Sequence, residues 1–81
     1  MSNVKIIGTV SFWNAGGGYG FLDYSENGEI RSIYTHYTQL KNVDRLRKYQ
    51  IVQFVIGSND RGQIAREVEV IEDAEIKKNS R

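Results

Sequence analysis

The chain has 81 residues, of which 40% are hydrophobic and 26% are charged, and its formal net charge is +1. This composition is typical of one small folded domain, and the near-neutral charge neither indicates nor excludes a polyanionic partner. Because the chain has no cysteine and one histidine, a disulfide scaffold is excluded, and we expect neither a metal site nor another cofactor. The longest apolar run, residues 54–56, is far too short to span a bilayer, so we expect no membrane partner and a cytoplasmic location.

Five segments have the composition of β-strands. The chain has no proline and many β-branched and aromatic residues, which favours strands over helices. Turn signals separate the segments, and Asn27-Gly28 is a pair typical of tight hairpins. The predicted strands span residues 5–14, 19–24, 30–36, 51–57 and 63–71. Because open strand edges invite aggregation, we expect the five strands to close into a small barrel.

The other segments are connections and chain ends. Residues 38–50 form a longer polar connection, and the recurrence of Leu40, Val43 and Leu46 at intervals of three predicts a helical turn within it. We expect a single domain over residues 1–71. The charged residues 72–81 are expected to form a frayed tail.

Alternation along the predicted strands separates a core face from an outer face. In residues 51–57, Val52, Phe54 and Ile56 share one face and are expected in the core. In residues 30–36, Ile33 and Thr35 share one face, and Tyr34 and His36 share the other. In residues 19–24, Tyr19 and Phe21 lie opposite Leu22. The aromatic residues of these two strands are therefore expected on the face that points away from the core.

Aromatic residues are concentrated in the first half of the chain, which holds seven of the nine: Phe12, Trp13, Tyr19, Phe21, Tyr24, Tyr34 and Tyr37. Exposed clusters of rings need a physical reason, and unpaired nucleobases provide one because every base can stack on an aromatic side chain. Gly20 would leave room for a strand approaching such a surface. The alternative is that the rings pack in the core or cover a barrel mouth. We expect such a structural role for Tyr24 and Tyr49, and a core position for Phe54.

Three segments resemble the cold-shock domain of bacterial cold-shock proteins. They read Gly-Thr-Val-Ser-Phe-Trp-Asn from Gly8, Gly-Tyr-Gly-Phe-Leu from Gly18, and Ile-Tyr-Thr-His from Ile33. The last two are similar to the two ribonucleoprotein motifs of that family. The Gln-Ile-Val-Gln-Phe segment from Gln50, and Arg61-Gly62 with the residues that follow, continue the resemblance in the same order and spacing.

The resemblance implies an all-β, five-stranded antiparallel barrel of the oligonucleotide/oligosaccharide-binding (OB) fold. It also implies that the protein binds single-stranded RNA or DNA and acts as a nucleic-acid chaperone without a cofactor. Carried over by position, Tyr19, Phe21, Tyr34 and His36 fall on stacking residues of the family, and Tyr37 falls on the aromatic residue after the histidine. The candidate binding residues are Phe12, Trp13, Tyr19, Phe21, Tyr34, His36, Tyr37, Arg31, Lys41 and Arg61.

The sequence also departs from the family pattern. The usual Trp-Phe pair is reversed to Phe12-Trp13, so the motif leaves open which of the two rings stacks on a base. Two lysines of the family are replaced by Ser11 and Gly17, and basic residues lie instead in the following connection, at Lys41, Arg45, Arg47 and Lys48. With two lysines missing, we expect stacking to carry a larger share of the affinity and salt to weaken binding only mildly.

Two other classes of function compete with this interpretation. An enzyme is not expected, because His36 has no evident nucleophile or orienting carboxylate near it in the sequence, and no small-molecule substrate is expected either. The alternative to nucleic-acid binding is a diverged cold-shock barrel that acts as a protein-interaction or regulatory domain. The missing lysines, the near-neutral charge and the acidic residues Asp23, Glu26 and Glu29 favour that alternative.

Overall fold

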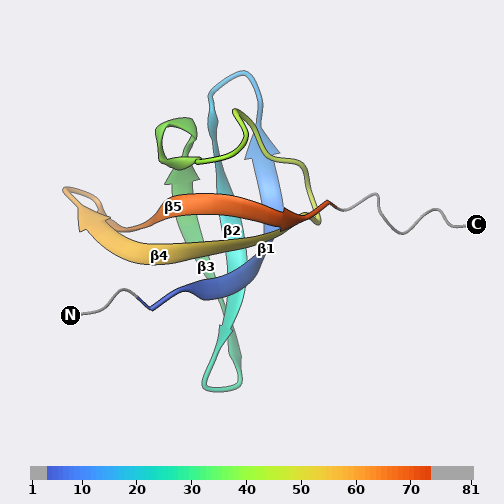
Figure 1. Cartoon of the computed structure of the whole chain (residues 1–81). Coiled ribbons are helices and arrows are strands. Elements are labelled where there is room, and N and C mark those ends of the chain that lie inside the picture. Colours follow the sequence, from blue (N-terminus) through green and yellow to red (C-terminus); the bar gives the residue numbers. More distant parts are fainter. Residues whose placement is uncertain (1–3, 74–81) are drawn as a thin grey trace, which may run out of the picture.

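The computed structural model describes residues 4–73, which form a closed β-barrel. Its strands are β1 (Ile6–Asn14), β2 (Tyr19–Glu26), β3 (Glu29–His36), β4 (Ile51–Asn59) and β5 (Gly62–Glu72), and a short 3₁₀ helix, η1 (Tyr37–Gln39), follows β3. The order around the barrel is β1-β2-β3-β5-β4 (Figure 1). The predicted five-stranded barrel is thus confirmed. Of the expected tail, only residues 72 and 73 are described, and the rest lies outside the described residues.

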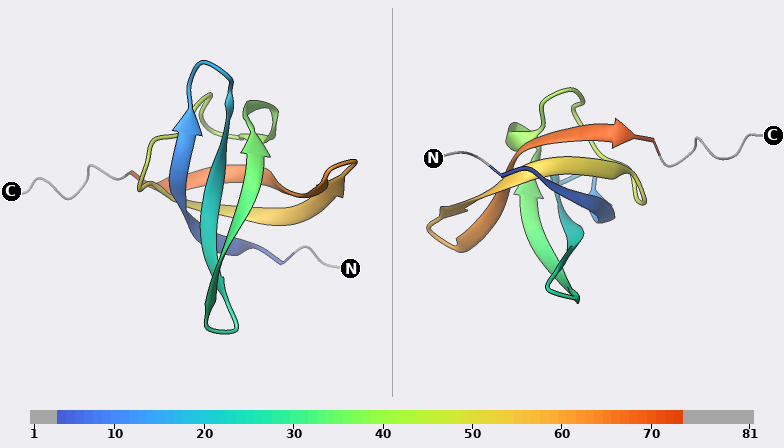
Figure 2. Two further views of the ribbon diagram at one scale, coloured as in Figure 1. Left: turned by 180° about the vertical axis from the view of Figure 1, so that it is seen from behind. Right: turned by 60° about the horizontal axis from the view of Figure 1, so that its bottom comes forward.

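Two layers of strands make the barrel. β1, β2 and β3 form one curved sheet, and the β4–β5 hairpin crosses it, as the two views of Figure 2 show. β1 belongs to both layers because its first half pairs with β4, from Ile6↔Phe54 to Thr9↔Ile51, while its second half pairs with β2. The outer face of β1, β2 and β3 is therefore one continuous surface that no other strand covers.

The barrel is antiparallel except where it closes. β3 and β5 run in the same direction and meet at one register pair, Tyr34↔Ile64. The buried hydroxyl of Thr35 donates a hydrogen bond of 3.0 Å to the carbonyl oxygen of Ala65 beside this pair. A side-chain hydrogen bond thus reinforces the seam at which the backbone pairing is sparse.

The alternation predicted for the strands is confirmed in β2, in β3 and in β4 as far as Phe54, whereas Ile56, which the alternation places in the core, is only partly buried. Leu22 of β2, Ile33 and Thr35 of β3 and Val52 and Phe54 of β4 are all buried. Val55 of β4 is also buried although it follows Phe54, because the register with β5 shifts between Gln53 and Val55. The largest fully buried side chains are those of Phe54, Leu22, Val10, Val52, Val68 and Thr35.

The connections show one prediction confirmed and one wrong. Asn27 and Gly28 have φ values of 55° and 84°, the conformation of a tight hairpin turn of the primed type. The helical turn expected from the spacing of Leu40, Val43 and Leu46 is absent there, since the only helical turn in the described residues is η1. Leu40 instead bridges to Val68 of β5, and Leu46 is buried. Leu40, Val43 and Leu46 recur at intervals of three because each faces the core from an irregular segment, not because the segment is helical.

Candidate functional site

Four aromatic rings from three neighbouring strands lie together on the outer face of β1–β3. The ring centroids of Phe12 and Tyr19 are 6.3 Å apart, those of Phe12 and Phe21 are 6.5 Å apart, and Tyr34 lies 6.1 Å from Tyr19 and 5.9 Å from Phe21. The register explains the grouping, because Phe21 pairs with Phe12 on one side and with Tyr34 on the other. Period-two alternation then turns all four side chains to the same side.

The row of rings continues along β3 into η1. His36 is the register partner of Tyr19, and its ring centroid lies 4.6 Å from that of Tyr37. The imidazole Nδ1 accepts a 3.4 Å hydrogen bond from the backbone N–H of Thr38 and lies 3.0 Å from the hydroxyl oxygen of Thr38. These contacts hold the ring in position. We use the term aromatic face for Phe12, Tyr19, Phe21, Tyr34, His36 and Tyr37.

A β-bulge decides which ring of the Phe12-Trp13 pair joins the aromatic face. Strict alternation from the buried Val10 would turn Phe12 inward and Trp13 outward. The register with β2 shifts between Val10 and Phe12, so Ser11 is an extra residue and the order is reversed. Phe12 is 46% exposed on the aromatic face, whereas Trp13 packs against the core cluster. Trp13 is thus the one aromatic candidate of β1–β3 that the structure does not bring to this face.

Gly20 makes room for the indole of Trp13 and not for an approaching nucleic-acid strand. It is buried, and a Cβ atom there would lie 2.6 Å from Cε3 of Trp13 and would also collide with the backbone carbonyl oxygen of Phe12. The expectation that Gly20 clears the outer surface is therefore wrong. Its missing side chain makes room for the indole on the core side of the sheet.

The rings of the aromatic face remain accessible to solvent. Phe21 is 37% exposed and Tyr37 is 52% exposed, while Tyr24 is buried in an edge-to-face contact with Phe54, as expected. Tyr49 was expected to pack, and that expectation is wrong because it is 65% exposed. Its backbone has a φ of 78°, and the ammonium nitrogen of Lys48 lies 5.2 Å from its ring centroid.

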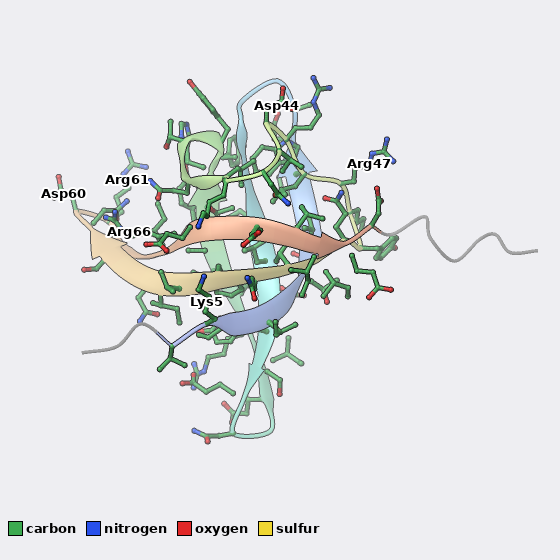
Figure 3. The ribbon with its side chains drawn as sticks, viewed as in Figure 1. Lys5, Asp44, Arg47, Asp60, Arg61 and Arg66 are labelled. Atoms are coloured by element: carbon green, nitrogen blue, oxygen red, sulfur yellow. The ribbon has the colours of Figure 1, made fainter. Side chains whose placement is uncertain are left out.

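None of the three basic candidates belongs to the aromatic face. Arg31 is on the opposite side of β3 by alternation, and its Nε is 2.7 Å from a carboxylate oxygen of Glu26. Lys41 is exposed in the segment after η1, where its backbone N–H donates to the carbonyl oxygen of Val68. Arg61 is exposed in the turn that precedes β5 (Figure 3). The aromatic face itself contains no lysine or arginine.

The end of this face nearest the β2–β3 turn is polar. Asp23 and Ser32 are register partners, and the hydroxyl of Ser32 donates a 2.8 Å hydrogen bond to the Asp23 carboxylate. Ser11, where the family pattern has a lysine, donates a 3.2 Å hydrogen bond to the carbonyl oxygen of Phe21. These residues place hydrogen-bonding groups and one negative charge beside the rings.

Two hollows lie next to the barrel strands. One, of about 300 Å³, lies at the end of the barrel where the β1–β2 turn meets the segment after η1. The other, of about 490 Å³, has a more apolar lining that includes Ile7, Ile30 and Ile51. The sequence did not indicate either hollow, because each combines residues from segments far apart in the chain. No helix among the described residues is long and apolar enough to cross a membrane.

Comparison with known proteins supports the resemblance found in the sequence. A family model described as the 'Cold-shock' DNA-binding domain matches residues 6–71, which include all five strands except the last residue of β5. No curated protein matches the chain. The match spans most of the chain and includes every residue of the aromatic face.

Proposed function

The chain belongs to the cold-shock domain family, a family of nucleic-acid-binding domains, and from this premise we propose that it binds single-stranded RNA or DNA by stacking unpaired bases on the aromatic face. The observation that carries the proposal is the row of solvent-accessible rings contributed by three adjacent strands, of which Phe12 and Phe21 are exposed and Tyr19 and Tyr34 are half-buried. Stacking of one base on an aromatic side chain is worth about 1–3 kcal/mol. Several such contacts supply useful affinity even where few cations meet the phosphates.

A chaperone activity follows from binding of this kind. The faces of bases in a duplex are already stacked on one another, so the rings can bind only bases that are unpaired and unstacked. A protein that binds the open form and not the paired form shifts the equilibrium toward the open form. We therefore propose that the protein opposes secondary structure in RNA or DNA, and that it works in the cytoplasm on such strands.

We propose no catalytic role for the aromatic face. Its acid–base candidates are His36 and the tyrosine hydroxyls, and no hydrogen bond among the described residues joins the His36 ring to a carboxylate that would orient it as a base. Stacking also makes no use of the ribose 2′-hydroxyl. The proposal therefore includes both RNA and DNA as partners.

The test is to remove two central rings and measure binding. We expect Phe21→Ala combined with Tyr34→Ala to weaken binding of a labelled oligothymidine or oligouridine by at least about 30-fold, because two stacking contacts are lost. Both rings are on the outer face, so the variant should keep its far-UV circular dichroism spectrum. The measurement is fluorescence anisotropy at low salt, with a stable hairpin as the competing paired ligand.

Tyr49→Ala is the matched control, because Tyr49 is an exposed ring outside the aromatic face. It should bind the oligonucleotide as the unmodified protein does. Equal losses in the control and the double variant, or a hairpin bound as tightly as the single strand, would contradict the proposal.

A second candidate function is a protein-interaction or regulatory domain built on the same barrel. The observation that favours it is the lack of lysine and arginine on the aromatic face, together with the Asp23 carboxylate at its edge. A protein with this function would keep its fold but fail to bind any single strand at low salt. The same anisotropy titration therefore separates the two candidates.

A further inference from the structure

The hollow at the end of the barrel is built from three segments that are distant in the sequence. Trp13 and the β1–β2 turn form one wall, Tyr37 of η1 contributes a second, and Asp44 and Arg45 contribute the third. In Figure 3, the labelled Asp44 lies beside the turn that joins β1 to β2. The volume, about 300 Å³, is at the lower end of the range of about 300–1,000 Å³ for small-molecule pockets, so it suits one base better than a longer segment.

The hollow is continuous with the aromatic face. Tyr37 belongs to both, because it lies 4.6 Å from the ring of His36 and also lines the hollow. The backbone N–H of Tyr37 donates a 2.8 Å hydrogen bond to the carbonyl oxygen of Gly18, which fixes η1 against the β1–β2 turn. A strand that leaves the aromatic face past His36 and Tyr37 therefore arrives at this hollow.

The lining has the chemistry that a nucleobase requires. Trp13 and Tyr37 both line the hollow and offer it ring surfaces. At the rim, Asp44 and Arg45 provide an acceptor and a donor, with 3.6 Å between the Arg45 Nε and the Asp44 carboxylate. Base edges carry both kinds of group.

We infer that this hollow is a subsite for one unpaired nucleobase, located beyond the aromatic face at one end of the bound strand. The inference rests on the proposed function and extends it. Trp13, which the bulge removes from the aromatic face, then contacts the nucleic acid from the core side of the sheet. Asp44 and Arg45 contact the edge of the same base.

Trp13 itself reports whether the subsite is filled, because it is the one tryptophan of the chain. A strand held only on the aromatic face leaves the indole untouched. The experiment titrates the protein with oligothymidines of about 4 to about 16 nucleotides, a range that covers the site sizes of such barrels. Binding is followed by anisotropy of the labelled strand, and occupation of the hollow by tryptophan emission with unlabelled strands. We expect the longer strands to change the tryptophan emission at saturation.

Gly16→Leu tests the same subsite by partly filling it. Gly16 lines the hollow, and a Cβ there would meet no atom closer than 3.6 Å, so the fold should accept the substitution. We expect the variant to bind the longer strands at least about fivefold more weakly, the low end of one stacked base, and to lose the emission change. Its thermal unfolding midpoint should match that of the unmodified protein.

Arg45→Ala provides a second test that does not depend on the glycine substitution. Its matched control is Lys48→Ala, which removes the same charge from the same segment at a residue that does not line the hollow. We expect the Arg45 variant to lose more affinity for the longer strands than the Lys48 variant, and equal losses would overturn the subsite.

The possible failures are distinguishable. Saturable binding by anisotropy without a change in tryptophan emission overturns the subsite and leaves the aromatic face intact. Absence of binding to every strand overturns the proposed function and the subsite with it.

Discussion

At the residue scale, one glycine and one bulge determine which aromatic side chain is available to a ligand. The extra residue Ser11 reverses the alternation of β1, so Phe12 faces outward and Trp13 faces the core. Gly20, the register partner of Trp13, then leaves the space that the indole needs. The outward position of Phe12 thus depends on a residue of the neighbouring strand that has no side chain.

We expect Gly20→Ala to destabilise the protein by about 1–3 kcal/mol, the usual cost of adding a methyl group where there is no room. The new Cβ would collide with Trp13 and with the backbone of Phe12. Gly16→Ala is the control, because a Cβ there would make only an ordinary contact, 3.6 Å from the amide oxygen of Asn14, and it should be close to neutral. Urea unfolding of the two variants measures the difference. Equal stability of both variants would show that the indole is not held against β2.

At the scale of the elements, the barrel depends on the seam between β3 and β5. These strands share one parallel register pair, whereas β2 and β3 are paired along their whole lengths. The buried hydrogen bond from Thr35 to Ala65 lies at this seam, one residue from Tyr34 of the aromatic face. The seam therefore positions the third strand of the candidate site.

We expect Thr35→Val to lower the free energy of unfolding by about 1 kcal/mol, because the shape of the side chain is kept while the hydrogen bond is lost. Thr9→Val makes the same change in β1, at a hydroxyl for which the described residues show no hydrogen bond, and should cost less. Chemical denaturation gives both values. A Thr9 variant that is as destabilised as the Thr35 variant would mean that the hydroxyl at the seam contributes nothing specific.

At the scale of the whole molecule, the lysines and arginines lie outside the aromatic face, although Arg45 lines the hollow together with Tyr37. The formal net charge is +1, the aromatic face has no cation, and Arg31 is already paired with Glu26 and Glu29. Lys41 and Arg61 are the remaining basic candidates, and both are exposed. On the proposed function, we therefore expect affinity for a single strand to come mainly from stacking.

The measurable consequence is a weak dependence of binding on salt. If Lys41 and Arg61 neutralise about two phosphates, affinity for oligothymidine should fall only about sevenfold between about 50 and about 200 mM salt. Anisotropy titrations at several salt concentrations give the slope. Lys41→Ala with Arg61→Ala should flatten it further and leave tight binding at high salt. A loss of about a thousandfold over the same range would mean that phosphate contacts dominate instead.

The sequence by itself determined the strands, the core and the family. Alternation is a local property with a period of two residues, so Leu22, Ile33 and Phe54 could be placed in the core without knowledge of their neighbours. The Asn27-Gly28 turn is equally local, because both residues tolerate the positive φ that the turn requires. The same alternation placed Tyr19, Phe21 and Tyr34 on one side of their strands.

Only the tertiary structure decided which of Phe12 and Trp13 points outward, because a bulge is a matter of register between two strands and not of either strand alone. It also decided the conformation around Leu40 and Leu46. Their spacing predicts a helical turn, but both residues face the core from an irregular segment. The hollow beside Trp13 required three separate segments to meet at one end of the barrel. Contacts between residues distant in the chain follow from the closure of the barrel, and no local pattern encodes them.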